Sequence, residues 1–104
     1  SAARAKLEMS NFQAVERDFA FLVDEKITAA EILKAVKQAE KNLISYVDIF
    51  DVYQGKGVEP GKKSVAFSIR LEPKDRTLTD KEIETVSQQV ISSVEKSVGG
   101  VLRS

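Results

Sequence analysis

Apolar and polar residues alternate along two segments of the chain, the pattern of β-strands with one buried face. The clearer segment runs from Lys63 to Glu72. Large apolar residues take every second position there, at Val65, Phe67, Ile69 and Leu71. The segment Val15–Asp24 has the same period, carried by Val15, Phe19, Phe21 and Val23. Both segments therefore predict strands of an antiparallel sheet with one solvated face.

Two further segments are expected to be strands, with less regular patterns. Leu43–Tyr53 is rich in β-branched and aromatic residues, and Val101–Arg103 is a short last strand. The alternation in Leu43–Tyr53 is imperfect, because Val47 and Ile49 share the parity of the polar Asp51. Either these two apolar residues lie partly exposed or a β-bulge intervenes.

Two helices are indicated by capping signals followed by apolar residues at helical spacing. Thr28 and Thr79 are each followed three residues later by a glutamate, the spacing of a capping box. The first helix is predicted from Ala29 to about Lys41. The second is expected to end at Gly99–Gly100, because glycine favours the C-terminal cap.

The elements follow one another as strand, helix, strand, strand, helix, strand. This order predicts the ferredoxin-like split βαβ fold, an α+β architecture with two helices on one face of a four-stranded antiparallel sheet. The 104 residues suffice for one domain with a packed core. The other sheet face is expected to be open. Since this fold carries many functions, the function has to be argued from the side chains on that face.

The composition excludes several kinds of chemistry. The chain has no Cys and no His, so it lacks thiolate nucleophiles, cysteine zinc sites and Ser-His-Asp catalysis. We therefore expect no enzymatic activity and no cofactor in this chain. The formal net charge is zero, but Gln54–Arg76 holds six basic residues against three acidic ones. This modest positive region suits RNA binding or a solvated hairpin about equally.

The ends of the chain favour a piece of a larger cytoplasmic protein. No apolar run approaches the ~18 residues of a membrane helix, and the N-terminus does not resemble a signal peptide. No membrane partner is expected. The chain opens with Ser1 and its only methionine is Met9. Residues 1–10 are interpreted as an interdomain linker with a cloning remnant at the front, and residues 11–104 as the folded domain.

Three polar residues are candidates for binding a nucleobase on the open face. Asp51 and Tyr53 lie two positions apart near the end of their strand, and Ser64 begins the next strand on its polar side. If these strands pair through the intervening loop, the three side chains meet at one end of the open face. An aromatic ring stacks on a base, a carboxylate accepts from its amino and imino groups, and a hydroxyl donates or accepts.

Four basic residues are candidates for phosphate contacts that position an RNA loop: Lys56, Lys62, Lys63 and Arg70. Simpler roles exist for the base-binding candidates. A tyrosine at a strand end commonly packs half-buried, a serine that opens a strand often has no special role, and an aspartate protects a sheet edge from mispairing. The residues by themselves give the RNA hypothesis weak support.

Five motifs occur in order along the chain: RDFAFLVD (Arg17–Asp24), IFDVYQG (Ile49–Gly55), GKKSVAFSIRL (Gly61–Leu71), DRTLTDKEI (Asp75–Ile83) and the closing LR (Leu102 and Arg103). Together they resemble the ferredoxin-fold anticodon-binding domain, which ends the β chain of bacterial phenylalanyl-tRNA synthetase. The resemblance runs from about Asn11 to Arg103, and five ordered motifs make it highly specific. One departure is Gln13, where the family commonly has proline; it affects only the stiffness of entry into the first strand.

The resemblance implies that the domain grips the anticodon stem-loop of tRNA-Phe at the outside of an (αβ)2 enzyme. In the family, the tyrosine and aspartate of an F-D-x-Y motif and the serine of a K-S motif approach the first anticodon base, a guanine. The matching residues here are Tyr53, Asp51 and Ser64. The parent enzyme is implied to join phenylalanine to tRNA with ATP and magnesium, a reaction that belongs to the α subunit.

Two other functions stay open. A small-ligand regulatory domain of this fold needs a glycine-rich turn between the first strand and the first helix. The turn Asp24–Ile27 is acidic and free of glycine, which disfavours that function. A protein-interaction module would instead use small residues of the open face, such as Ala20, Ala66 and Ser68, to let a partner approach closely.

Overall fold

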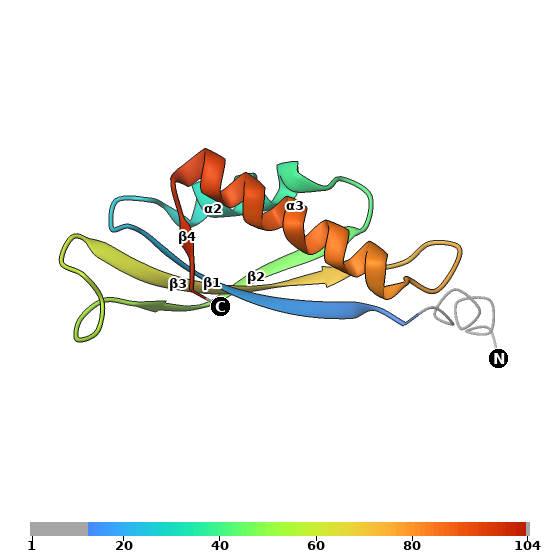
Figure 1. Ribbon diagram of the computed structural model, residues 1–104, viewed down its shortest axis with the longest axis horizontal. Coiled ribbons are helices and arrows are strands. Elements are labelled where there is room, and N and C mark those ends of the chain that lie inside the picture. Colours follow the sequence, from blue (N-terminus) through green and yellow to red (C-terminus); the bar gives the residue numbers. More distant parts are fainter. Residues whose placement is uncertain (1–12, 104) are drawn as a thin grey trace.

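The computed structural model describes residues 13–103, which form a sheet covered on one face by two helices (Figure 1). The elements in chain order are β1 (Val15–Asp24), α2 (Ala29–Ala39), β2 (Ile44–Tyr53), β3 (Lys62–Leu71), α3 (Asp80–Val98) and β4 (Val101–Leu102). The predicted order of strands and helices is confirmed. The linker expected at residues 1–10 lies outside the described residues.

The four strands lie in the order β2-β3-β1-β4, and each neighbouring pair is antiparallel. The two central strands pair along their whole length, from Val15 opposite Leu71 to Asp24 opposite Lys62. Both helices pack on the same face, and the opposite face carries neither of them (Figure 1). The ferredoxin-like split βαβ fold predicted from the sequence is therefore confirmed.

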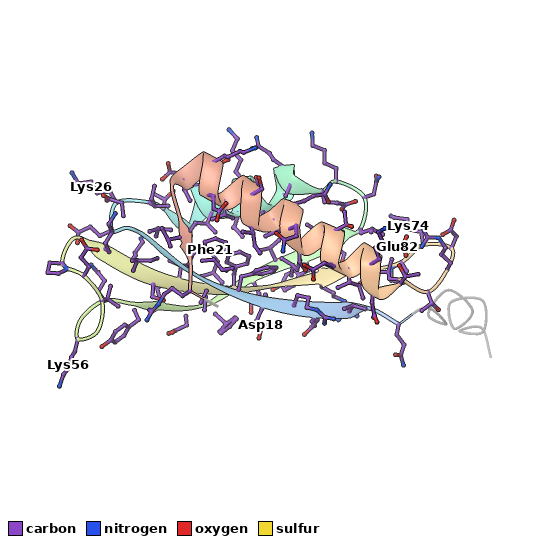
Figure 2. All side chains as sticks on the ribbon, in the orientation of Figure 1. Asp18, Phe21, Lys26, Lys56, Lys74 and Glu82 are labelled. Atoms are coloured by element: carbon purple, nitrogen blue, oxygen red, sulfur yellow. The ribbon has the colours of Figure 1, made fainter. Side chains whose placement is uncertain are left out.

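The hydrophobic core lies between the sheet and the helices. Phe67 at the centre of β3 is fully buried, and its ring stacks on Phe19 and Phe21 of β1 with centroid distances of 5.4 and 5.8 Å. Figure 2 shows Phe21 between the sheet and the helices. On the helix side, α3 contributes Val90 and Val94. Burying side chains of this size is worth ~1.5–3 kcal/mol each, which fixes the face that the helices cover.

Both predicted capping boxes are present. The Thr28 hydroxyl accepts the backbone N–H of Glu31 at 3.1 Å, and the Glu31 carboxylate accepts the N–H of Thr28 at 2.8 Å. Thr79 and Glu82 make the same two bonds at 3.1 and 2.8 Å. Hydrogen bonds from the capping backbone hold the pKa of both carboxyls below their ordinary value of 4.5. Helix α3 ends at Val98 and is capped, as predicted, by a glycine, Gly99, with a left-handed φ of 68°.

Helix α2 ends at Ala39, slightly before the predicted end at Lys41. Glu40 leaves the helix with an extended backbone. Its carboxylate accepts three consecutive backbone N–H groups, those of residues 42–44, at 3.0, 2.7 and 3.2 Å. These charge-assisted bonds organise the turn into β2 and compete with continuation of the helix. No helix in the described part of the chain is long and apolar enough to cross a membrane.

The edge strand β2 is interrupted by two register shifts, one near its start and one in its second half. In the second, Ile49 lies opposite Phe67 and Asp51 lies opposite Ala66, so Phe50 is an extra residue. The β-bulge reverses the phase of the strand. It allows Ile49 to face the helices and Asp51 to face the open side, although the two residues share parity. Both explanations left open by the sequence hold in part: the bulge is present, and Val47 and Ile49 are only partly buried.

Candidate nucleic-acid interface

The three residues predicted to bind a base lie together on the open face, next to the hairpin between β2 and β3. Tyr53 pairs directly with Ser64, and Asp51 pairs with Ala66, the next residue of β3 on the same face. Directly paired residues of this kind have Cβ atoms ~5 Å apart. Tyr53 is 44% exposed, so its ring is not part of the core. The arrangement that the hypothesis requires is present, and its contact with RNA stays a prediction.

The bulge adds an aromatic residue that the sequence analysis did not single out. Phe50 immediately precedes Asp51 and is 54% exposed. Because it follows the helix-facing Ile49, its position in the register is on the open side, next to Asp51. The conflict of parity between Ile49 and Asp51 was the available signal, but it could not show which residue is the extra one. An exposed ring beside a carboxylate suits stacking on a base.

Tyr53 is also bonded to its own hairpin. Its hydroxyl donates to the backbone carbonyl of Lys56 at 2.8 Å. The amide of Gln54 donates to the carboxylate of Glu25 in the β1–α2 turn at 3.1 Å. The hairpin loop is therefore joined both to the candidate site and to the neighbouring turn, which restricts the positions available to the loop.

The four basic candidates do not gather in one place. Lys56 extends outward from the hairpin loop (Figure 2). Lys62 is two positions before Ser64 in β3, so both are on the open side. Lys63 has the opposite phase and pairs with the buried Val23, and its charge contributes to the low pKa of a helix-side carboxyl, that of Glu31. Of the three lysines, the structure places only Lys56 and Lys62 with the base-binding candidates.

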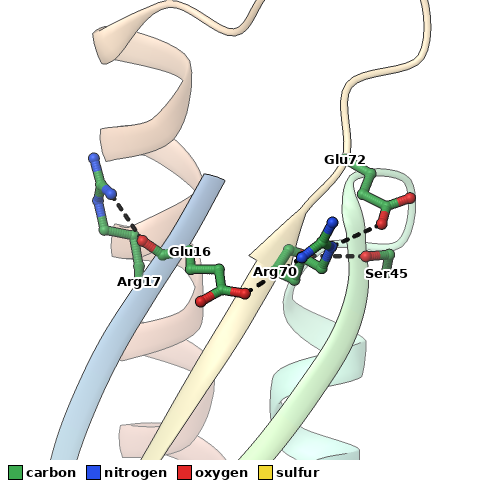
Figure 3. Close-up of polar contacts among 5 residues, drawn as sticks. All are labelled: Glu16, Arg17, Ser45, Arg70 and Glu72. Atoms are coloured by element: carbon green, nitrogen blue, oxygen red, sulfur yellow. Dashed lines mark hydrogen bonds and ion pairs between the residues drawn. The ribbon is translucent and has the colours of Figure 1, made fainter. Parts of the chain in front are cut away.

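Arg70 lies far from this group, ~20 Å from Ser64 along β3 at about 3.3 Å per residue. Its guanidinium pairs with Glu72 at 2.9 Å and with Glu16 at 3.4 Å (Figure 3). The bond to Glu72 raises the pKa of Arg70, and the guanidinium in turn lowers the pKa of Glu72. The structure thus does not bring Arg70 to the base-binding candidates, and two carboxylates already balance its charge.

Acidic and small residues occupy the middle of the open face. Asp18 of β1 and Asp48 of β2 both lie opposite Ser68, one from each side, and Asp18 points away from the helices (Figure 2). Ala20 and Ala66 form the adjoining pair. No group of three or more His, Cys, Asp or Glu side chains within residues 13–103 is placed to hold a metal ion. The carboxylates disfavour a phosphate backbone at the centre of the face.

The β1–α2 turn has no backbone donor left for a small anionic ligand. The N–H of residue 25 donates to the Gly61 carbonyl at 3.0 Å, and that of residue 28 donates to the Glu31 carboxylate at 2.8 Å. The N–H groups of residues 26 and 27 both donate to Asp24, to its carboxylate at 2.9 Å and to its carbonyl at 3.0 Å. A ligand carboxylate bound in such a turn would need those donors free. The anchoring group on which the small-ligand alternative depends is therefore already occupied.

The fold is that of a ferredoxin-like domain, and comparison with known proteins specifies the family. Residues 10–103 match the family described as the ferredoxin-fold anticodon binding domain. The chain belongs to this family. The family resemblance drawn from the five sequence motifs is confirmed.

The chain is similar to phenylalanine–tRNA ligase beta subunits of several bacteria. It is 50% identical to that of Rhodopseudomonas palustris over 97% of its own length. It is 49% identical to that of Rhodospirillum rubrum over 100% of its length, and 48% identical to that of Bradyrhizobium diazoefficiens over 97%. The chain spans 13% of the length of each of these three relatives.

Proposed function

We propose that this chain is the part of a phenylalanine–tRNA ligase beta subunit that binds the anticodon stem-loop of tRNA-Phe. The binding surface is the hairpin end of the open face, which consists of Asp51, Tyr53, Ser64, Lys56 and Lys62. One observation carries the proposal: Tyr53 and Ser64 are direct cross-strand partners with Asp51 beside them on a solvent-open sheet face. The chain's membership of an anticodon-binding family supports the same surface.

The hydrogen-bonding groups of the hairpin end favour guanine. The Asp51 carboxylate only accepts, and its two oxygens can receive two neighbouring N–H groups at once. Guanine presents two neighbouring N–H donors, imino and amino, on its Watson–Crick edge. Each of the other bases has only one donor group on that edge, which would leave an acceptor of the site without a partner.

The base and the backbone of the RNA loop require different contacts. The Tyr53 ring offers a stacking surface worth ~1–3 kcal/mol per base. Lys56 and Lys62 supply positive charge on the same side, which positions phosphates without reading the sequence. An unstacked base of a single-stranded loop can reach such a shallow patch, whereas the edges of a paired base cannot.

The proposal assigns no chemical step to this chain. The joining of phenylalanine to tRNA, with ATP and magnesium, takes place in the remainder of a cytoplasmic (αβ)2 enzyme. This chain needs no cofactor of its own and acts by holding the anticodon loop. Correct placement of a distant substrate arm changes rates strongly, because misplacement of reacting atoms by about 1 Å can cost ~100-fold.

Deletion of this domain from the ligase that carries it tests the proposal. Aminoacylation of tRNA-Phe is expected to fall by about 100-fold or more, because the acceptor end is no longer positioned. ATP-dependent activation of phenylalanine, which needs no tRNA, is expected to stay within about twofold of the intact enzyme. Equal loss of both activities would instead identify a structural interaction module, and full aminoacylation without the domain would contradict the proposal.

A further inference from the structure

The loop between β2 and β3 folds back over the end of Tyr53. The phenol donates to the carbonyl of Lys56 at 2.8 Å, three residues later in the chain. Gly55 lies between these residues with a φ of 130°, a backbone conformation that residues with a side chain rarely adopt. A Cβ at Gly55 would lie 3.4 Å from the phenol oxygen. The positive φ therefore accounts for the glycine at this position, where the loop backbone lies against the hydroxyl.

The remainder of the loop is held by backbone hydrogen bonds. Within it, Val58 donates to Gly55 at 2.9 Å and Lys62 donates to Glu59 at 3.0 Å. These bonds fix the shape of the loop itself. The Tyr53–Lys56 bond is the contact that joins this shape to the aromatic ring on the sheet face, since it pairs a side chain of β2 with the loop backbone.

We propose that the Tyr53 hydroxyl is a positioning group: it fixes the backbone at Lys56 next to the stacking ring, so that the lysine side chain binds one phosphate of the RNA near the base on Tyr53. The inference rests on the proposed function. The ring serves for stacking, and the hydroxyl serves mainly to place a cation. A lysine on a loop held in this way loses less loop entropy on binding than a lysine on an unattached loop, and this preorganisation increases affinity.

The chain offers an internal comparison for this role. Tyr46 is the other tyrosine of β2, and it is also exposed, at 60%. Within the described residues, no hydrogen bond involves its hydroxyl, whereas the hydroxyl of Tyr53 is bonded. Of the three loop glycines with a positive φ, Gly55, Gly57 and Gly61, Gly55 is the one that lies against the phenol. The positive φ of Gly55 is a strained choice for any other residue, and it occurs where the loop meets the phenol.

A double-mutant cycle tests the proposal, with Tyr53→Phe and Lys56→Gln in this chain and anticodon stem-loop RNA as the probe. NMR titration measures the Kd even when binding is weak. Tyr53→Phe keeps the ring and removes the hydrogen bond to the Lys56 carbonyl, so binding is expected to weaken ~2–5-fold, the size of a coupled contact. In the Lys56→Gln background the same change is expected to cost less than about 1.5-fold, since no cation remains to be positioned.

The salt dependence gives a second readout. Tyr53→Phe and Lys56→Gln are both expected to lower the slope of log K against log salt, by up to about 0.7–0.9 units for one lost phosphate contact. A hydroxyl that reads the base directly would leave this slope unchanged. The inference is overturned if Tyr53→Phe weakens binding as much in the Lys56→Gln background as in the original chain. It is also overturned if the Tyr53→Phe chain binds as tightly as the original.

A measurement without RNA tests whether the Tyr53–Lys56 hydrogen bond holds the loop. The backbone order parameter at Lys56 is expected to fall from about 0.85 toward 0.6 in Tyr53→Phe, and Gly55→Ala is expected to loosen the same residue. Tyr46→Phe should change neither. Tyr53→Ala separates the two hypotheses. No effect of Tyr53→Ala on RNA binding contradicts the proposed function, whereas loss of binding together with an additive cycle contradicts only the positioning role.

Discussion

The two ends of the open sheet face carry similar side chains, but the charges are paired differently. The hairpin end has Tyr53 and Lys62. The far end, defined by Tyr46 and Arg70 with Glu16 and Glu72, has an exposed tyrosine and a basic residue of β3 as well. Arg70 is held between two carboxylates, while no ion pair within residues 13–103 involves Lys56 or Lys62.

This difference shows why an exposed aromatic ring is not by itself a sign of a binding site. Tyr46 is more exposed than Tyr53, at 60% against 44%. Its cross-strand partner, however, is an arginine whose charge is already balanced. A phosphate arriving there would have to displace carboxylates, whereas no carboxylate within residues 13–103 forms an ion pair with Lys56 or Lys62. The charge environment, more than the aromatic residue, distinguishes the two ends.

The largest contrast is expected between two aspartates of β2. Asp51→Asn removes the charged acceptor from the hairpin end and should weaken binding of a guanine-containing anticodon loop by about 10–100-fold, the range for hydrogen bonds to charged groups. Asp48→Asn, opposite Ser68 in the middle of the face, is the matched control and should change binding less than about twofold. Calorimetry or NMR titration gives both values. Equal effects of the two substitutions would contradict the assignment of Asp51.

A smaller contrast is expected between Lys62 and Arg70. Lys62→Gln should weaken all RNA loops alike, by about 3–10-fold near physiological salt, and should reduce the salt slope by about one unit. Arg70→Gln should leave RNA binding within about twofold, since its charge is already paired. Titrations at several salt concentrations measure both effects. A larger loss for Arg70→Gln than for Lys62→Gln would place phosphates at the far end instead.

The smallest effect concerns the pH dependence of the far end. The Arg70 guanidinium holds the pKa of Glu72 below 4.5, so the ionised carboxylate favours the folded state. This contribution is complete above about pH 5 and is lost as the pH falls through the lowered pKa. Glu72→Gln should therefore lower the Tm slightly at neutral pH, and the difference from the original chain should close as the pH falls through the lowered pKa of Glu72. A Tm difference between the two chains that grows on acidification would contradict this role of Glu72.

Much of the fold could be predicted because local signals and tertiary structure agree. The segment Val15–Asp24 is a strand with the predicted bounds, and both capping threonines begin helices. The end of α2 is an exception, because the helix stops at Ala39 instead of Lys41. The Glu40 carboxylate accepts hydrogen bonds from the backbone that follows, and these bonds depend on the path of the chain into β2.

The site was predictable to a smaller extent, because its geometry depends on pairing between strands. The meeting of Tyr53 with Ser64 follows from a simple hairpin and could be expected. The identity of Phe50 as the extra residue depends on the register with β3, which one strand's sequence does not determine. The pairing of Arg70 with Glu16 joins residues far apart in the chain, and no periodicity within either segment indicates it.

The most direct test of the account compares Tyr53→Ala with Tyr46→Ala for binding of the tRNA-Phe anticodon stem-loop, with the Tm of each variant measured alongside. Loss of the stacking surface at Tyr53 should weaken binding by about 5–100-fold, and loss of Tyr46 by less than about twofold. Because both rings are exposed, neither change should lower the Tm substantially. Equal binding by the two variants, or a fall in binding that only follows unfolding, would contradict the hairpin end as the RNA site.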